Sequence, residues 1–228
     1  MSSTVEQVQR DLRELMQRDV DFDYRPQGHL TDRPTRRSSV LILFGALDRT
    51  PATESVSSVP PELDVLLIRR SNALRHHPGE IAFPGGGVEP QDRDLTMTAL
   101  REAEEETHLD PSGVEVLGML PEVHIPVSNN LVTPVVGWWT RPSQIAADAS
   151  ESVEVFRAPV AELLDPAARG TSVLRSGSTT FRGPAFQLGP RFGGHLVWGF
   201  TGILLSSLFR ELQWELPWDK KREFQLRR

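Results

Sequence analysis

The sequence predicts an α/β fold in which a mixed sheet is flanked by helices. Short apolar runs rich in β-forming residues lie on both sides of a central segment with helical spacing, and an apolar helix follows near the C-terminus. With 228 residues, of which 38% are hydrophobic, the chain can bury one sizeable core. We therefore expect one domain over residues 1–228, with two small domains as the alternative.

The composition excludes several classes of function. A net charge of −6 argues against a nucleic-acid-binding surface. The absence of cysteine excludes disulfides, thiol catalysis and cysteine-ligated zinc. The N-terminus lacks the pattern of a secretory signal, and no apolar run is long enough to span a bilayer. We expect a cytoplasmic protein with neither nucleic acid nor membrane as partner; the sequence leaves a homodimer open.

The first part of the chain predicts one helix, two strands and two loops. Residues 4–18 have helical spacing and should form an amphipathic helix capped by Ser3 or Thr4. Its expected buried stripe is Val5, Val8, Leu12 and Leu15 or Met16. Strands are expected at residues 39–47 and 64–69, an extended segment at 79–83, and loops at 21–37 and 49–63.

The second half predicts further strands and two helices. Strands are expected at residues 114–120 and 131–139, an extended segment at 153–156, a short helix at 159–164 and an apolar helix at 195–212. Pro134 suggests that its strand is an edge strand or carries a bulge. Residues 170–194 are rich in Gly, Ser and Pro, so at most short hairpin strands are expected. We expect the tail at 213–228 to be frayed.

Residues 85–109 hold the densest cluster of candidate functional residues. Three glycines open the segment and four glutamates lie near its end, which we interpret as a loop followed by a helix. Because a helix turns about 100° per residue, three glutamates share an arc of about 100°. These are Glu102, Glu105 and Glu106. Glu104 falls on the other side, with the expected buried stripe of Leu100, Thr96, Met97, Ala103 and Thr107. The expected helix cap is Asp92 or Asp94.

The three aligned carboxylates permit two interpretations. The first is an acidic face turned to solvent, which is the usual role of a run of charges. The second is a metal site, because neighbouring like charges destabilise a helix and a cation would turn their repulsion into ligation. Mg²⁺ is commonly held by a few carboxylates together with substrate phosphates. Arg101 can pair with Glu105 one helical turn later.

The end of this segment resembles the Nudix box. That family's motif has a glycine, a spacer, and then Arg-Glu-aliphatic-x-Glu-Glu-x-Gly-aliphatic. Residues 101–109 read Arg-Glu-Ala-Glu-Glu-Glu-Thr-His-Leu. Only His108 departs from the motif, at the position where the family usually has glycine.

The start of the box can be aligned in two ways. In strict spacing, Gly87 opens the box and Arg93 takes its early acidic position. If Gly86 opens it instead, Asp92 takes that position and one extra residue precedes Arg101. The second spacing is similar to that of one branch of the family, the coenzyme A diphosphatases.

That branch also carries an upstream motif, which this sequence matches. Residues 66–71 read Leu-Leu-Ile-Arg-Arg-Ser, and they are followed at the motif's spacing by Arg75, Gly79 and a Phe-Pro-Gly-Gly run at 83–86. Only Ile68 departs from the motif. Two linked motifs make the resemblance to this branch specific.

The resemblance implies a fold, a reaction and a set of metal ligands. The fold would be an α/β/α sandwich with a mixed sheet. The reaction would be Mg²⁺- or Mn²⁺-dependent cleavage of the diphosphate of coenzyme A or its thioesters, giving 3′,5′-ADP and 4′-phosphopantetheine or its acyl form. The implied metal ligands are Glu102, Glu105, Glu106 and the carbonyl of Gly86.

The resemblance also implies roles for other residues. Arg101 would orient Glu105, and the general base would be Glu105, Glu106 or Glu151, the last of which could equally be a surface residue. The candidate phosphate-binding residues are Arg69, Arg70, Arg75 and His77. Two alternatives remain: hydrolysis of ADP-ribose or a dinucleotide, and a non-catalytic nucleotide-binding module. His124 and His195 lack metal spacing and are expected to be structural.

Overall fold

The computed structural model describes residues 3–18, 35–46, 52, 58–73, 77–126, 128–148, 152–177 and 179–226. Its main sheet has eight strands in the order β3-β2-β1-β7-β5, with β4 paired to β1, β6 to β7 and β8 to β2. The strands of this sheet are β1 (Arg36–Ala46), β2 (Leu63–Arg70), β3 (Ile81–Ala82), β4 (Gly85–Gly87), β5 (Val114–Met119), β6 (Val123–Ile125), β7 (Asn130–Trp139) and β8 (Ser152–Pro159). β1 and β7 are parallel and the other pairs are antiparallel, so the sheet is mixed.

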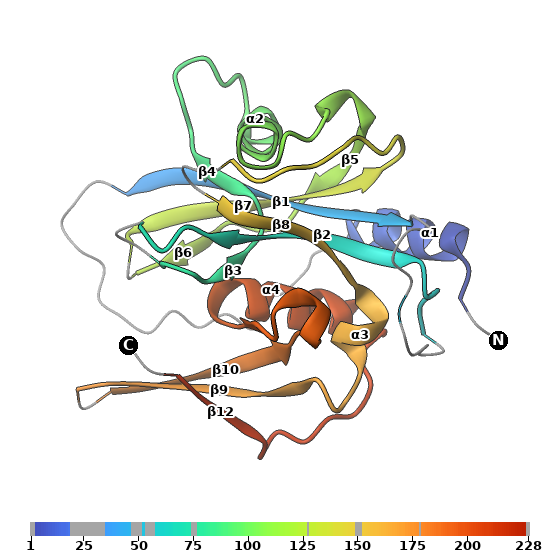
Figure 1. Cartoon of the computed structure of the whole chain (residues 1–228). Helices are drawn as coiled ribbons and strands as arrows, with labels where there is room; N and C mark the ends of the chain where they lie inside the picture. The colour runs from blue at the N-terminus through green and yellow to red at the C-terminus, as the bar shows by residue number, and fades with distance from the viewer. Residues whose placement is uncertain are drawn as a thin grey trace.

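Helices cover both faces of the main sheet. A second sheet lies on the far side of helix α4 from the main sheet (Figure 1). The helices are α1 (Val5–Leu15), α2 (Leu95–Thr107), α3 (Val160–Leu164) and α4 (Gly199–Glu211). The second sheet has the order β11-β10-β9-β12, formed by β9 (Arg169–Ser176), β10 (Thr179–Gln187), β11 (Leu196–Val197) and β12 (Glu223–Leu226). We call the described part of residues 169–226 the C-terminal lobe. Its helix α4 lies between the two sheets.

Two hydrophobic clusters follow the alternation of side chains along the strands. The smaller packs α2 on one face and includes Leu41, Leu43, Leu66, Ala99 and Ala103. The larger fills the opposite face and contains buried residues of α1, α3 and α4, for example Leu12, Leu164 and Leu208. The predicted α/β fold with a mixed sheet and flanking helices is therefore confirmed. In the described residues, no helix is both long and apolar enough to cross a bilayer.

The structure confirms the predicted N-terminal helix. Thr4 caps α1, because its hydroxyl accepts a hydrogen bond from the Gln7 N–H. Val8, Leu12 and Leu15 are buried, as the stripe predicted. The predicted short helix after Pro159 is also present as α3.

Of the two possibilities predicted for Pro134, an edge strand or a bulge, the edge strand is wrong, because β7 pairs with β1 on one side and with β5 and β6 on the other. The proline is tolerated at the point where the neighbouring chain passes from β5 to β6. There the Leu120 N–H donates to the Pro134 carbonyl. The register of β5 against β7 shifts nearby, between Val116 and Gly118.

Four other local predictions need correction. The helix predicted at 195–212 begins only at Gly199, because Leu196–Val197 form strand β11. The expected glycine loop contains strand β4, which pairs with β1. Most of the segment 170–194 belongs to two long antiparallel strands, β9 and β10, which reach Gln187, because β-formers such as Val173 and Phe186 alternate with the small residues. The tail is not frayed throughout: Trp214 is buried, and β12 pairs in parallel with β9.

Candidate active site

The three glycines place a bare stretch of backbone beneath helix α2. In β4, Gly85, Gly86 and Gly87 pair with β1 opposite Val40, Ser39 and Ser38. The Gly85 N–H donates to Glu106 Oε2 at 2.8 Å. This bond joins the last turn of α2 to the strand below it, and it holds one carboxylate oxygen of Glu106 in place.

Gly86 provides the space into which Glu102 folds. A Cβ added at Gly86 would overlap the Glu102 carboxylate, whereas a Cβ at Gly87 would meet no atom within 4 Å. Of the two alignments of the box, the one that opens at Gly86 therefore matches the geometry. The glycine is required there by the close approach of a carboxylate.

Local sequence determines where α2 begins and ends. Asp94 is the N-cap, with its carboxylate accepting from the Met97 N–H at 2.8 Å. At the other end, His108 adopts the left-handed conformation with φ 56° and ψ 22°. Glycine adopts this conformation without steric cost, which accounts for the glycine that the Nudix box has at the position of His108.

The helical projection located the buried face of α2 only in part. Ala103 and Thr107 are buried as expected, but Glu102 and Glu106 are buried too. Glu104 is exposed, contrary to the prediction. The projection took Leu100 as the centre of the buried face, whereas the glycines of β4 leave space under the helix for the carboxylates of Glu102 and Glu106.

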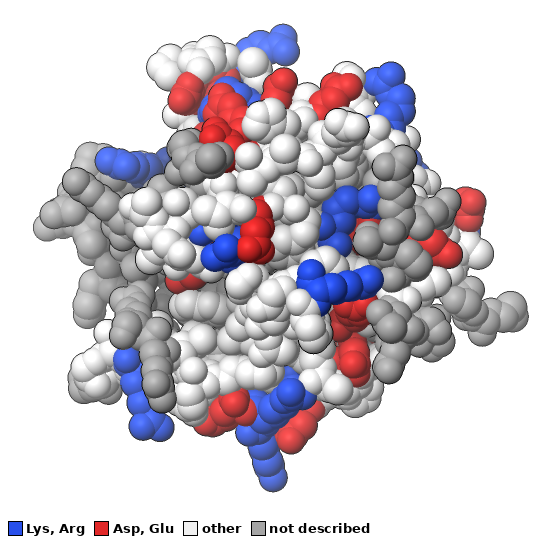
Figure 2. Space-filling view, viewed as in Figure 1, with Lys and Arg blue, Asp and Glu red and all other residues white. Residues whose placement is uncertain are grey.

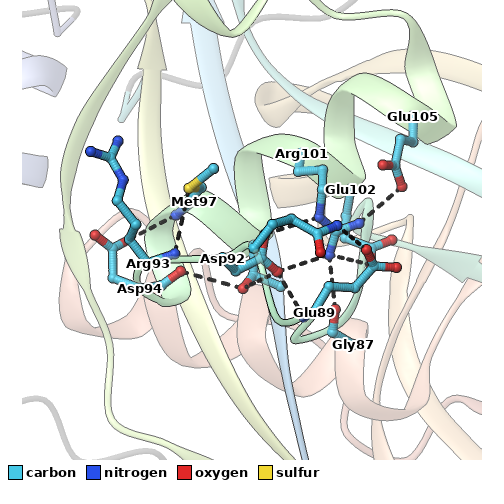
Figure 3. A network of polar contacts seen from close by, with 11 residues as sticks. Gly87, Glu89, Asp92, Arg93, Asp94, Met97, Arg101, Glu102 and Glu105 are labelled. Atoms are coloured by element: carbon cyan, nitrogen blue, oxygen red, sulfur yellow. Dashed lines mark hydrogen bonds and ion pairs between the residues drawn. The ribbon is translucent and has the colours of Figure 1, made fainter.

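Arg101 is the centre of a polar network that joins the helix to the preceding loop (Figure 3). Its guanidinium donates to Asp92 through two nitrogens, at 3.0 and 3.1 Å, and to the Gly87 carbonyl at 2.9 Å. It also pairs with Glu102 and with Glu105, each at 3.0 Å. The predicted Arg101–Glu105 pair is present, as one contact of several.

These contacts shift the pKa values at the centre of the network. The hydrogen bonds from Arg101 hold the pKa of Asp92 at about 2. The same bonds, with the charges of Glu102 and Glu105, raise the pKa of Arg101 above its usual range. Both groups therefore remain charged over the whole physiological range. Sequence reasoning did not include Asp92 among the site residues; the signal for it was its place in the alignment that opens at Gly86.

The predicted phosphate-binding arginines are separated by the sheet. Arg70 Nη1 lies 3.9 Å from Glu106 Oε1, on the face of α2. Arg69 points to the other face, where its Nη2 lies 2.7 Å from Glu154 Oε1. His77 pairs with Glu80 at 2.9 Å.

Two predicted residues, Arg75 and Glu151, lie outside the described residues. The described part of the chain thus brings together Glu102, Glu106, Arg70, Arg101 and the glycines, with Glu105 at the rim.

Residues 52–172 match the NUDIX domain family, which is more than half of the chain. The chain belongs to the NUDIX domain family. A relative from Photorhabdus laumondii, named an uncharacterized Nudix hydrolase NudL, is 34% identical over 154 residues, which cover 67% of this chain and 79% of the relative. This Nudix protein is thus an enzyme, a hydrolase that acts on pyrophosphate bonds.

Two further similarities cover parts of the Nudix chain. A NudL relative from Escherichia coli is 45% identical over 104 residues, which span 46% of this chain and about half of the relative, 54%. The NUDIX domain of Shewanella oneidensis NrtR, solved with ADP ribose, is 20% identical with a TM-score of 0.42 and covers 62% of this chain and 82% of that one.

Nudix enzymes in general depend on a divalent metal, and the donor set here fits one. Glu102 and Glu106 supply carboxylate oxygens beside the backbone of β4, and oxygen is the donor that Mg²⁺ and Mn²⁺ prefer. Within the described ranges, no three His, Asp or Glu side chains are already gathered as a metal site. Glu105 is turned toward Arg101, and its side chain is 56% exposed.

Proposed function

We propose that this Nudix hydrolase cleaves the diphosphate of coenzyme A or acyl-coenzyme A, releasing 3′,5′-ADP and 4′-phosphopantetheine or its acyl form. The supporting observation is that the two linked motifs meet at Glu106. The upstream motif brings Arg70 to within 3.9 Å of Glu106 Oε1, and the glycine run donates to Glu106 Oε2 at 2.8 Å. The motif that suggests coenzyme A is therefore part of the same site as the box.

The proposed metal ligands are Glu102, Glu105, Glu106 and the Gly86 carbonyl, with Mg²⁺ or Mn²⁺ as the ion. When bound, such an ion polarises the diphosphate and lowers the pKa of a bound water. Arg101 acts as a positioning residue, because it holds Glu102 and Glu105 by charge-assisted bonds. The proposed general base, which takes the proton from the attacking water, is Glu105, Glu106 or Glu151.

The proposed phosphate contacts begin with Arg70. Its guanidinium lies beside Glu106 and is a bidentate match for a phosphate. Arg75 and His77 are the other proposed phosphate-binding residues. Arg69 is engaged with Glu154 on the other face, so it supports the site less directly than the sequence predicted.

A product assay tests the substrate. Wild-type protein with Mg²⁺ or Mn²⁺ is incubated with coenzyme A, acetyl-coenzyme A, dephospho-coenzyme A, ADP-ribose and NADH, and the products are separated by chromatography. We expect the highest kcat/KM for coenzyme A or its thioester, with 3′,5′-ADP as product. Preferential cleavage of ADP-ribose or NADH would instead support the alternative hydrolase.

A matched pair of variants tests the carboxylate assignment. Glu106→Gln should reduce turnover by at least a hundredfold while the fold is kept, because the amide is a poor ligand and a poor base. Glu104→Gln, on the exposed side of the same turn, should leave turnover unchanged. Near-normal activity of Glu106→Gln would contradict the assignment.

A further inference from the structure

We infer that Glu154 is a positioning residue for Arg70, and that the C-terminal lobe holds Glu154 in place through His195. The inference concerns a network of polar contacts that begins next to the site and ends outside the matched family segment, residues 52–172. It rests on the proposed function in one respect, since Arg70 must act on the substrate.

The end of β2 is built to direct two consecutive arginines to opposite faces. Arg69 is paired with Glu154 of β8, and Arg70 with Ser152. The register therefore shifts between the two arginines because β8 has an extra residue, Val153, at this point, and such bulges re-aim the side chains of their own strand next to active sites. Because consecutive side chains of a strand point to opposite faces, an Arg69 held by Glu154 on one face helps to keep Arg70 directed to the other face, beside Glu106.

Glu154 contacts both Arg69 and the C-terminal lobe. Its Oε1 lies 2.7 Å from Arg69 Nη2, and its Oε2 lies 3.5 Å from His195 Nε2. The carboxylate therefore bridges the end of β2 and the lobe. Among the described residues on the face seen in Figure 2, several basic side chains likewise lie against acidic ones.

The loop before β11 is shaped to present His195. Gly193 and Gly194 have φ values of 67° and 61°, which favour glycine. A Cβ at Gly193 would lie 2.6 Å from His195 Nε2, so the ring packs directly on this residue. The His195 carbonyl accepts from the Leu188 N–H at 2.8 Å, which anchors the loop to the lobe. These contacts agree with the expectation that His195 is structural, and they identify Glu154 as its polar partner.

The start of β8 is tied to helix α2 as well. The Ser152 hydroxyl donates to the Glu106 carbonyl at 2.8 Å, two residues before Glu154. One short segment therefore contacts the carboxylate helix, the arginines and the C-terminal lobe. A change at Glu154 should therefore act first on Arg69 and His195, which it contacts, and through Arg69 on the neighbouring Arg70.

Stability and kinetics distinguish positioning from simple packing. The side chains of Arg69, Glu154 and His195 are 22%, 43% and 29% exposed. Polar contacts between side chains with this exposure contribute little to stability. If the network is only structural, Glu154→Ala should change neither kcat/KM nor Tm appreciably. If it positions Arg70, the catalytic parameters should change while Tm hardly moves.

A double-mutant cycle tests the inference. The kcat/KM of wild type, Glu154→Ala, Arg70→Ala and the double variant is measured on the best substrate of the product assay, with Tm for each. We expect about a tenfold loss for Glu154→Ala, a larger loss for Arg70→Ala, and no further loss in the double variant. Glu154→Gln, which keeps a hydrogen-bond acceptor, should recover part of the activity. The control is Glu223→Ala, which removes an exposed ion pair of the lobe with Arg182.

Three outcomes would overturn the inference. They are an unchanged kcat/KM for Glu154→Ala, losses that multiply in the double variant, and an Arg70→Ala variant as active as wild type. The substrate proposal is decided separately, by the products of the wild-type protein. Failure of one can therefore be told from failure of the other.

Discussion

At the scale of single residues, the site depends on which glycine lies under which carboxylate. The sequence offers three consecutive glycines and two alignments of the box, and spacing alone does not choose between them. The structure chooses Gly86, because only there does the Glu102 carboxylate occupy the place of a side chain. The choice depends on a contact between strand and helix, which no local pattern contains.

The two neighbouring glycines make a matched test. Gly86→Ala should displace the Glu102 carboxylate, the flexible end of a side chain, so we expect a small change in Tm but at least a tenfold loss of activity and weaker Mn²⁺ binding. Gly87→Ala should be nearly neutral, because its Cβ points into open space. Titration calorimetry with Mn²⁺ and initial rates measure both effects. Equal losses in the two variants would argue against this role of Gly86.

His108 illustrates a different limit of sequence reasoning. The resemblance located the end of the helix correctly, although the residue there is unusual for the family. The backbone nevertheless adopts the left-handed conformation, and the His108 N–H donates to the Glu104 carbonyl at 2.8 Å. The terminating geometry is therefore kept without glycine.

At the scale of elements, α2 is fixed at both its cap and its middle. Its existence and its cap followed from periodicity and from the acidic residues before it. Its buried face could not be predicted in this way, because a helical projection contains no information about the facing strand β4, which consists of glycines. The loop before it is tied down by Arg101, whose contacts with Asp92 span nine residues.

The Asp92–Arg101 contact should make the free energy of unfolding depend on pH in the acid range. The pKa of Asp92 is lowered to about 2 by its hydrogen bonds from Arg101, and an unfolded aspartate titrates near ~4. The stabilisation is therefore complete above about pH 4 and is lost as the pH falls through about 2. Asp92→Asn should lower stability by about 2 kcal/mol at pH 6.

Thermal unfolding from pH 7 to pH 2 measures this effect. The Tm difference between wild type and Asp92→Asn should narrow as the pH approaches 2. Asp94→Asn is the control, because asparagine caps a helix about as well as aspartate. A difference that stays constant down to pH 2 would show that Asp92 does not stabilise the fold through its charge.

At the scale of the whole molecule, the C-terminal lobe was the least predictable part. Its Gly/Ser/Pro-rich composition resembles loop, yet its strands form a sheet that packs on α4. Arg169 is fully buried in this lobe, with its guanidinium 4.4 Å from the Phe186 ring centroid and 4.7 Å from that of Trp218. It also pairs with Glu215 at 2.9 Å. The tail is held by contacts between residues far apart in the sequence, such as Arg169 with Glu215 and Trp218. Composition alone does not reveal such contacts and therefore suggested fraying.

Removing this buried arginine should loosen the tail. We expect Arg169→Ala to lower the unfolding free energy by about 3 kcal/mol, because a buried ion pair and two aromatic contacts are lost together. Arg182→Ala, which breaks an exposed pair in the same lobe, should cost under about 1 kcal/mol. Urea unfolding monitored by tryptophan fluorescence measures both. Similar values for the two variants would contradict the assignment of Arg169 as the anchor.

The position of strand β1 in the sheet limits where the chain of this enzyme can be cut into fragments. This strand lies between β2 and β7 and pairs with β4, yet all of its residues, Arg36–Ala46, precede the segment that matches the family. A fragment cut at the boundaries of that segment would lose the middle of its sheet and the support of the glycines. Domain swaps, truncations and fusions in this enzyme should therefore keep residue 36 joined to the box.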